Sequence, residues 1–260
     1  MLQQLVQRAF GNRPGPYVIG HRGAAGYAPE NTMVAFERGI ALRADAIELD
    51  VHPTADGHLV VIHDPTLNRT TNGSGLVAQH TLAQLRELDA GSWFDPSFAS
   101  ERIPTLREVL DWARGRTKVV IEIKQGPIFY PNVEQLLVAE LDAAGMRDDV
   151  LVISFDHQSV RRVKELAPDI VTGVLYAGRM IDPVPLAKAA NADALLPYWA
   201  LLTKEEVDAA HEAGLIVSPW GGPEQDYRII LATGVDAVGA DFPDRPRTVM
   251  EEHAARLGNT

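Results

Sequence analysis

Short apolar runs alternate with amphipathic stretches along most of the chain. Runs of this length predict buried strands, and stretches whose apolar residues recur at helical spacing predict helices. The predicted strands are residues 17–20, 46–52, 118–124, 150–155, 171–176, 194–197, 215–220 and 237–241. The predicted helices are residues 32–42, 105–113, 132–144, 157–166, 183–190, 204–213, 224–233 and 246–256.

Several of the predicted helices begin or end at a residue suited to that position. Thr203 can cap the helix that follows it, and Glu206, placed three residues later, completes a capping box. Gly145, Gly214 and Gly234 lie where helices would end in the left-handed conformation. These end signals agree with the hydrophobic periodicity about where the helices lie.

The alternation of strand and helix predicts a (β/α)₈ TIM barrel, a fold of about 250 residues, in a chain of 260. A doubly wound parallel sheet is the alternative. It is disfavoured because no glycine-rich dinucleotide turn follows the first strand and the alternation continues through eight units. No Gly/Ser-rich linker divides the sequence. We therefore expect one catalytic barrel domain over residues 1–260.

The segment between the second and third predicted barrel strands, residues 53–117, is longer than the usual connection in a barrel. Within it, HLVVIHD predicts an extra strand, LNRTTNGSG a turn-rich loop, and residues 81–88 a short helix. We therefore expect an insertion with structure of its own over residues 53–104.

Composition narrows the class of protein. Hydrophobic residues make up 46% of the chain and charged residues 23%, as in a globular protein with a sizeable core. No apolar run is long enough to cross a bilayer, and the opening MLQQLVQRAF lacks the features of a signal peptide. These features predict a cytoplasmic protein without stable membrane insertion. The absence of cysteine excludes disulfides, thiolate metal sites and a cysteine nucleophile.

The net charge of −11 argues against a nucleic-acid-binding protein, which normally presents a basic face. It also constrains any site for an anionic substrate. Such a site must reverse the sign of the charge locally, with a metal ion or with clustered arginine and lysine.

Two predicted strands carry charged residues two positions apart. Glu48 and Asp50 flank Leu49 in AIELDVH, and Glu122 and Lys124 repeat this spacing in VVIEIKQ. Because side chains alternate along a strand, each pair points to one face. Both pairs lie in the carboxyl-terminal halves of their strands, and in a barrel that end carries the active site.

Carboxylates gathered at one end of a barrel repel one another unless a cation compensates them. Glu48, Asp50 and Glu122 offer oxygen ligands, which suit Ca²⁺ or Mg²⁺, and the absence of cysteine weakens the case for zinc. The alternative is that they form ion pairs with Lys124 and with arginines and bind no metal. Two such pairs on separate strands favour the metal, because burying several like charges without a cation is costly.

Histidine and arginine follow the first predicted strand at the same end. His21 is a candidate proton shuttle and Arg22 a candidate clamp for phosphate oxygens. His63 ends the extra strand beside Asp64 and is the second candidate shuttle. Serine catalysis is disfavoured because no G-x-S-x-G elbow occurs around Ser154 or Ser159. The remaining histidines are expected to be structural: His52, His58, His80, His157, His211 and His253.

Several segments together resemble a known family. GHRGAAGYAPENT, AIELDVHPTADGHLVVIHDPTLNRTTNGSG, IPTLREVL and EIK look like the signature segments of the glycerophosphodiester phosphodiesterase family, and they occur in the family's order. The resemblance spans residues 17–247, most of the chain. It implies a metal-dependent barrel that hydrolyses glycerophosphodiesters to sn-glycerol 3-phosphate and an alcohol.

The resemblance also implies roles for individual residues. It places metal ligands at Glu48, Asp50 and Glu122, acid/base histidines at His21 and His63, phosphate contacts at Arg22 and Lys124, and substrate-facing aromatics at Phe155 and Trp220. The chain departs from the family's pattern after Trp220, where SPWGGPEQD replaces a Thr-Val-Asn-like stretch. The PENT segment is expected to cap the first helix through Asn31 or Thr32.

The sequence leaves alternatives open. The attacking group in the hydrolysis is water or the substrate's own glycerol hydroxyl, and the resemblance implies the hydroxyl and a cyclic phosphate. A lysophospholipase D-like activity on longer lipids is compatible with the same residues. Lys124 could instead form a Schiff base, as in barrel aldolases, but Glu122 would keep its ammonium charged. A barrel that only binds phosphorylated ligands is disfavoured, because the sequence offers candidates for every polar role in catalysis: metal ligands, fixed cations and acid/base histidines. The expected partner is a small-molecule glycerophosphodiester, and a homo-oligomer is compatible with the sequence.

Overall fold

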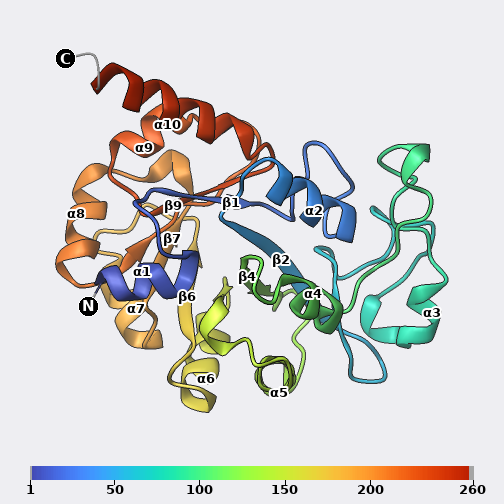
Figure 1. Cartoon of the computed structure of the whole chain (residues 1–260). Helices are drawn as coiled ribbons and strands as arrows, with labels where there is room; N and C mark the ends of the chain where they lie inside the picture. Colours follow the sequence, from blue (N-terminus) through green and yellow to red (C-terminus); the bar gives the residue numbers. More distant parts are fainter. Residues whose placement is uncertain (1, 258–260) are drawn as a thin grey trace.

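Eight parallel strands form the barrel of the computed structural model, which describes residues 2–257 (Figure 1). They are β1 (Tyr17–Gly20), β2 (Ala46–Pro53), β4 (Lys118–Ile123), β5 (Val150–Ser154), β6 (Val171–Tyr176), β7 (Ala194–Pro197), β8 (Ile216–Val217) and β9 (Ala237–Ala240). Paired neighbours follow the order β8-β7-β6-β5-β4-β2-β1-β9. Between β8 and β9, the backbone N–H of Asp236 donates to Val217 O (2.9 Å). The predicted TIM barrel is confirmed.

Helices surround the barrel and begin and end close to the predicted positions (Figure 1). Thr203 accepts a hydrogen bond from the Glu206 N–H while the Glu206 side chain accepts one from the Thr203 N–H, so the predicted capping box forms. Gly145, Gly214 and Gly234 have φ of 64°, 77° and 88°, as predicted for helix ends. The helices are α2 (Met33–Ala41), α4 (Leu106–Ala113), α5 (Val133–Ala144), α6 (His157–Leu166), α7 (Val184–Ala190), α8 (Lys204–Glu212), α9 (Tyr227–Ala232) and α10 (Asp244–Leu257). Short 3₁₀ helices lie at η1 (Val77–Gln79), η2 (Pro96–Phe98), η3 (Arg147–Asp149) and η4 (Trp199–Leu201).

The segment around β8 departs most from the sequence prediction. The strand predicted over residues 215–220 is reduced to Ile216–Val217. Pro219 has no N–H to donate, which interrupts the ladder, although the N–H of Trp220 still reaches Pro197 O (2.9 Å). The next helix, α9, begins later than predicted because Asp226 caps it by accepting the N–H of Arg228. A loop therefore replaces part of both predicted elements.

Helix α1 (Leu2–Phe10), which the hydrophobic pattern did not predict, packs on the barrel. Its buried Ala9 and Phe10 join the core cluster inside the barrel, where they meet residues such as Tyr17, Val120 and Leu151. These strand residues lie toward the amino-terminal end. A helix of nine residues is marginal on its own, so burial of its apolar face accounts for its formation.

The long segment after β2 contains the predicted extra strand and short helix, as β3 (Leu59–Val61) and α3 (Leu82–Arg86). β3 pairs antiparallel with β2, with Val61 opposite Val51. A separate apolar cluster fills the segment, formed by Val60, Ile62, Leu67, Val77, Leu85, Ala90 and Ile103. The pairing of β3 with β2 brings the residues that follow β3, including His63, to the carboxyl-terminal end of the barrel.

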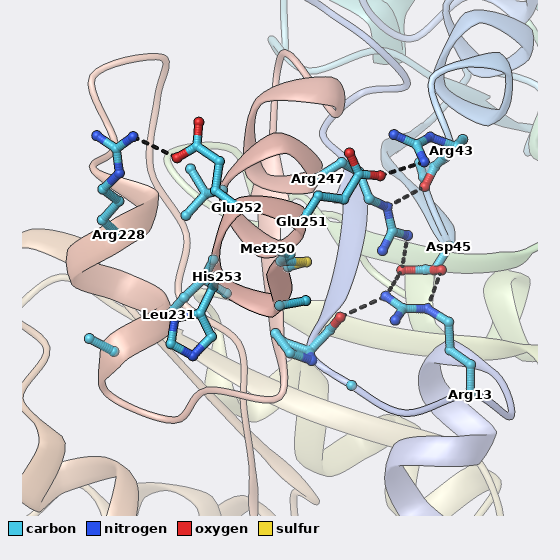
Figure 2. Close-up of a pocket in the computed structure, with 16 residues that line it drawn as sticks. Arg13, Arg43, Asp45, Arg228, Leu231, Arg247, Met250, Glu251, Glu252 and His253 are labelled. Atoms are coloured by element: carbon cyan, nitrogen blue, oxygen red, sulfur yellow. Dashed lines mark hydrogen bonds and ion pairs between the residues drawn. The ribbon is translucent and has the colours of Figure 1, made fainter. Parts of the chain in front are cut away.

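At the amino-terminal end, a partly buried aspartate, Asp45, links β2 to β1. The Asp45 carboxylate accepts the backbone N–H of Val18 (2.7 Å) and is bound by Arg13 from the N-terminal segment and Arg247 from α10 (2.5 Å), as Figure 2 shows for the arginines. The backbone N–H of Asp45 also donates to Val18 O (2.7 Å). One residue thus fixes the register of two strands and the position of a distant helix.

The same arrangement recurs at two further strand starts, in the sequences ADA before β7 and VDA before β9. Asp193 accepts the backbone N–H of Thr172 (2.9 Å), and Asp236 accepts that of Val217 (2.8 Å). Each carboxylate also has a basic partner, Lys164 for Asp193 (2.7 Å) and His211 for Asp236 (3.0 Å). We call Asp45, Asp193 and Asp236 the amino-end aspartates. Each links a strand to its neighbour through the side chain as well as the backbone.

A depression of about 1250 Å³ lies between α10 and the amino-terminal end, as Figure 2 shows. It is larger than the pocket at the other end of the barrel, described below. The arginines that line it are each bound to a carboxylate: Arg13 and Arg247 to Asp45, Arg43 to Glu251, and Arg228 to Glu252. The positive charges of these arginines are thus already paired with carboxylates of the protein. None of the helices within residues 2–257 combines the length and apolar content that crossing a bilayer requires.

Candidate active site

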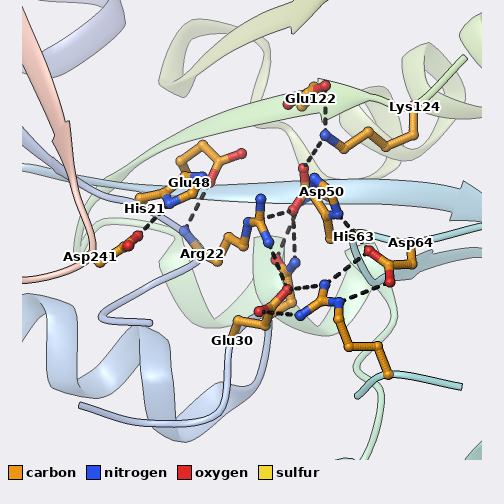
Figure 3. A network of polar contacts seen from close by, with 12 residues as sticks. His21, Arg22, Glu30, Glu48, Asp50, His63, Asp64, Glu122, Lys124 and Asp241 are labelled. Carbon is orange, nitrogen blue, oxygen red and sulfur yellow. Dashed lines mark hydrogen bonds and ion pairs between the residues drawn. The ribbon is translucent and has the colours of Figure 1, made fainter. Parts of the chain in front are cut away.

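The pocket at the carboxyl-terminal end of the barrel has a volume of about 220 Å³ and is lined on one side by the predicted polar residues. His21 and Arg22 follow β1, and Glu48 and Asp50 lie on β2. Glu122 lies on β4, directly opposite Asp50 in the parallel register of β2 and β4. Because these strands are neighbours, residues distant in sequence converge, as Figure 3 shows.

Three buried carboxylates form the centre of this site. Glu48, Asp50 and Glu122 are 6%, 1% and 8% exposed, and one oxygen from each lies within 4.8 Å of the others. Burial, together with the charge of Asp50, raises the pKa of Glu48 to about 7. Burial likewise raises the pKa of Glu122 above its ordinary value. Glu48 and Glu122 therefore resist ionisation where they lie, and the triad can hold a metal ion.

Two cations lie against the triad. Lys124 Nζ is 3.0 Å from Asp50 Oδ1 and 2.7 Å from Glu122 Oε1. Arg22 Nε is 3.5 Å from Asp50 Oδ2, and the backbone N–H of Arg22 donates to Glu48 Oε2 (2.8 Å). Although burial opposes a charge on Asp50, Lys124 and Arg22 outweigh it and hold the pKa of Asp50 well below its usual range. Asp50 and Glu122 in turn raise the pKa of Lys124 despite its burial.

His21 is held by a carboxylate that the sequence analysis did not identify. Its Nδ1 donates to Asp241 Oδ1 (2.5 Å), so its Nε2 faces Glu48 Oε2 at 3.9 Å. Asp241 follows β9 as His21 follows β1, and these strands pair. Burial opposes protonation of His21, but the hydrogen bond to Asp241 and the charge of Glu48 outweigh it and raise its pKa. The one sequence signal for Asp241 was its place as the final residue of the last predicted strand.

His63 has a similar partner but different surroundings. Its Nδ1 donates to Asp64 Oδ1 (2.8 Å). Asp64 is bound by Arg69 (2.8 Å), Arg69 also binds Glu30 (2.7 Å), and Glu30 binds Arg22 (2.8 Å), so one network connects the two sides of the site (Figure 3). Burial and the nearby Lys124 and Arg22 lower the pKa of His63, against the influence of Asp50. The sequence did not identify Glu30 and Arg69 as site residues. Both are charged residues in loops, where no periodicity distinguishes a functional residue from a solvent-exposed one.

The PENT segment has two separate roles. Thr32 caps α2 by accepting the N–H of Ala35, as one of the two predicted alternatives stated. Asn31, the other alternative, instead adopts a left-handed conformation with φ 58° and donates from Nδ2 to Asp50 Oδ2 (2.8 Å). The segment therefore starts the helix and holds one carboxylate of the triad.

His52, predicted to be structural, contacts the backbone of the site residue His63. It is buried, its Nε2 donates to His63 O (2.9 Å), and its Nδ1 lies 3.0 Å from Tyr130 Oη. Burial lowers its pKa to about 4, so it is neutral at physiological pH. His52 thus positions the backbone that carries His63.

The opposite wall of the pocket is apolar. Phe155 and Trp220, both singled out from the sequence, line it together with Leu175 and Leu196. Trp220 is fixed by a hydrogen bond from Nε1 to Tyr176 O (3.1 Å), whereas Phe155 keeps 44% of its surface exposed. The pocket thus has a charged side suited to a phosphate and an apolar side suited to the organic part of a ligand.

Comparisons with known proteins agree with this arrangement. Residues 21–245 match the model of the glycerophosphoryl diester phosphodiesterase family. A glycerophosphodiester phosphodiesterase from Caldanaerobacter subterraneus subsp. tengcongensis is 41% identical over 229 residues, covering 87% of this chain and 94% of that protein. A putative glycerophosphoryl diester phosphodiesterase from Silicibacter pomeroyi has a similar structure, with a TM-score of 0.86, 29% identity, and coverage of 96% of this chain and 98% of the other.

A phosphodiesterase from Oleispira antarctica, solved in complex with the product sn-glycerol 3-phosphate, aligns with a TM-score of 0.80 and 27% identity, over 91% of this chain and 97% of the other. The family match covers most of the chain, and the relatives are covered nearly end to end. The resemblance seen in the sequence and the predicted class of enzyme are confirmed. The chain belongs to the glycerophosphoryl diester phosphodiesterase family.

Proposed function

We propose that this protein hydrolyses glycerophosphodiesters to sn-glycerol 3-phosphate and an alcohol, using a divalent cation and two histidines. The observation that carries the proposal is the triad of Glu48, Asp50 and Glu122, whose oxygens lie within 4.8 Å of one another beside His21 and His63. The product complex of the relative from Oleispira antarctica supports the same substrate class.

The triad suits a hard divalent cation. All its ligand atoms are carboxylate oxygens, the donors preferred by Ca²⁺ and Mg²⁺. Asp50 Oδ1 is buried and, within residues 2–257, has no partner with hydrogen-bond geometry, although Lys124 Nζ is nearby. A lone pair is therefore available for a cation. When bound, the cation would neutralise the non-bridging oxygens of the phosphodiester.

Arg22 and Lys124 supply fixed positive charge on the same side. In an acidic chain they are the cations nearest the triad that can attract and orient an anionic phosphodiester. The raised pKa of Lys124 keeps its ammonium charged, which disfavours the Schiff-base alternative. Lys124 thus acts as an electrostatic clamp.

The two histidines divide the proton transfers. His63, with its lowered pKa, is the general base, and its Nε2 takes the proton of the attacking hydroxyl. His21, with its raised pKa, is the general acid, and its Nε2 gives a proton to the departing alkoxide as the phosphorus–oxygen bond breaks. Asp64 and Asp241 hold the Nδ1–H of each ring and thereby direct Nε2 into the pocket.

The attacking hydroxyl is water or the glycerol hydroxyl beside the phosphate. In the second route a cyclic glycerol phosphate forms first, and water then opens it. The family resemblance favours this second route. Phosphorus NMR during turnover distinguishes them, because the cyclic ester accumulates transiently only in the second.

A substrate panel with metal depletion tests the proposal. The protein is treated with chelator, and Ca²⁺ or Mg²⁺ is restored with glycerophospho-choline, -ethanolamine, -glycerol or -inositol. We expect metal-dependent release of sn-glycerol 3-phosphate, lost in His21→Ala and His63→Ala and kept in His253→Ala, whose histidine is exposed at the opposite end. Failure of every substrate with every metal would refute the assignment.

A lysophospholipase D-like activity is the second candidate, favoured by apolar side chains exposed on loops that follow barrel strands. Phe129, after β4, is 70% exposed and Ile181, after β6, is fully exposed. Both lie at the carboxyl-terminal end, where a long acyl chain could contact them. Adding lysophosphatidylcholine to the panel tests it: release of choline at a rate comparable to that from glycerophosphocholine would establish it.

A further inference from the structure

The loop after β8, where the chain departs from the family's sequence pattern, owes its path to two glycines. A Cβ on Gly221 would lie 2.3 Å from Trp199 Cδ1, and one on Gly222 would lie 2.5 Å from Glu224 Oε2. Any other residue at these positions would displace the indole or the carboxylate. The double glycine therefore allows Trp199 and Glu224 to pack directly against the loop beside the pocket.

Besides Trp199, three aromatic rings lie in or beside this loop. The ring centroids of Phe155 and Trp220 are 5.1 Å apart with an interplanar angle of 87°, and those of Tyr198 and Trp220 are 5.0 Å apart at 54°. Trp220 and Phe155 line the pocket, and Phe155 is 44% exposed. Because the rings of Phe155 and Trp220 are inclined to each other, they present π-faces to the pocket in different directions.

A carboxylate accompanies the rings. Glu224 Oε1 accepts hydrogen bonds from the Gly222 N–H (3.2 Å), Trp199 Nε1 (3.4 Å) and Tyr198 Oη (3.5 Å). The pKa of Glu224 is held below its usual value. The hydrogen bond from its own backbone N–H has the largest effect, and the three donors named above add to it. Glu224 is exposed to solvent and does not itself line the pocket, but it is bonded to Gly222, which does, so its charge lies beside the pocket.

We propose that Phe155 and Trp220, supported by Tyr198 and Glu224 beside the pocket, form a subsite for a cationic leaving alcohol of the choline type. The inference rests on the proposed function, because it names the leaving group of that reaction. Aromatic faces attract a quaternary ammonium through their quadrupole, and a neighbouring carboxylate adds a charge that neutral alcohols such as glycerol or inositol cannot use. Tyr198, which does not itself line the pocket, acts by supporting Trp220 and Glu224.

A pair of substrates that differ only in charge tests the subsite. One is glycerophosphocholine, and the other is its neutral isostere, in which a 3,3-dimethylbutyl group replaces choline. We expect kcat/KM to be about tenfold higher for the choline ester, a difference typical of a partly desolvated cation–π site. The comparison uses the unmodified, metal-loaded protein, so it does not depend on the folding of any variant.

Variants locate the preference. Phe155→Leu and Glu224→Gln should each move the ratio of the two kcat/KM values toward one. Glu205→Gln, which removes an exposed carboxylate at the start of α8, is the matched control and should keep the ratio of the unmodified protein.

Equal kcat/KM for the two esters in the unmodified protein would overturn the inference, as would an unchanged ratio in both variants. Cleavage of both esters without discrimination would overturn the subsite alone. Cleavage of neither with any divalent cation would overturn the proposed function together with it.

Discussion

Carboxylates lie at both ends of this barrel, partly buried at the amino-terminal end and buried at the carboxyl-terminal end, and their surroundings differ. At the amino-terminal end, Asp45, Asp193 and Asp236 each accept a backbone N–H and pair with a basic side chain. At the carboxyl-terminal end, the triad of Glu48, Asp50 and Glu122 lies within 4.8 Å with Lys124 and Arg22 as its nearest cations. A carboxylate that is paired with its own basic residue stabilises the register of the strands. Three carboxylates gathered at one place instead create a site that a cation can complete.

Strand β9 is flanked by one carboxylate at each end of the barrel. Asp236 precedes the strand and binds the backbone of β8, and Asp241 follows it and binds His21. Only the four residues of β9 separate them. Substitutions at these two positions therefore compare stability and catalysis within one element.

The largest effect is expected at the triad. Glu48→Gln should lower kcat by about 10³-fold, because it removes a charged ligand and with it several kcal/mol of transition-state stabilisation. Thermal unfolding should be unchanged or shifted upward, since one of three buried like charges is lost. Steady-state kinetics with glycerophosphocholine and a melting curve measure both. Glu251→Gln, on α10, is the control, and full activity of Glu48→Gln would refute the role of the triad.

Asp241→Asn should lower kcat for glycerophosphocholine by about 10²-fold, because His21 loses the partner that directs its proton toward the leaving group. The loss should be much smaller for glycerophospho-4-nitrophenol, whose leaving group needs no proton. Comparing the two substrates separates a role in proton transfer from a structural one. An equal loss on both would contradict the positioning of His21 by Asp241.

Asp236→Ala should act on stability instead. Leaving the buried N–H of Val217 without its side-chain acceptor should lower the free energy of unfolding by about 2 kcal/mol, or about 4–8 °C in melting temperature. The kcat should stay close to that of the unmodified protein. Asp208→Ala, on the exposed face of α8, is the control for loss of a carboxylate. A large fall in kcat with an unchanged melting temperature would reverse the assignment of the two ends.

The smallest effect concerns pH. The ordinary pKa of histidine is 6.5. In this protein the pKa of His63 is below that value and the pKa of His21 is above it. A neutral base and a protonated acid therefore coexist around that pH, and kcat/KM should show a plateau that falls at lower pH as His63 gains a proton and at higher pH as His21 loses one. In Asp241→Asn the alkaline limb should move to lower pH. A profile unaffected by that substitution would assign the limb to another group.

Local patterns in the sequence were sufficient for the barrel and for much of the site. Strand and helix periodicities alternate through the chain, and Glu48–Asp50 and Glu122–Lys124 repeat the two-residue period of a strand. Since parallel strands end at the same side of a barrel, that spacing placed their side chains together before any contact was known. Regular geometry made these features predictable.

Only the tertiary structure decided which distant groups complete the site. Asp241 lies 220 residues from His21 and reaches it because β9 pairs with β1. Likewise, the network through Glu30 and Arg69 joins two loops, and α1 forms by burial against the barrel. None of these contacts leaves a periodic trace in the sequence, because each depends on the closure of the sheet and on the packing of irregular segments around it.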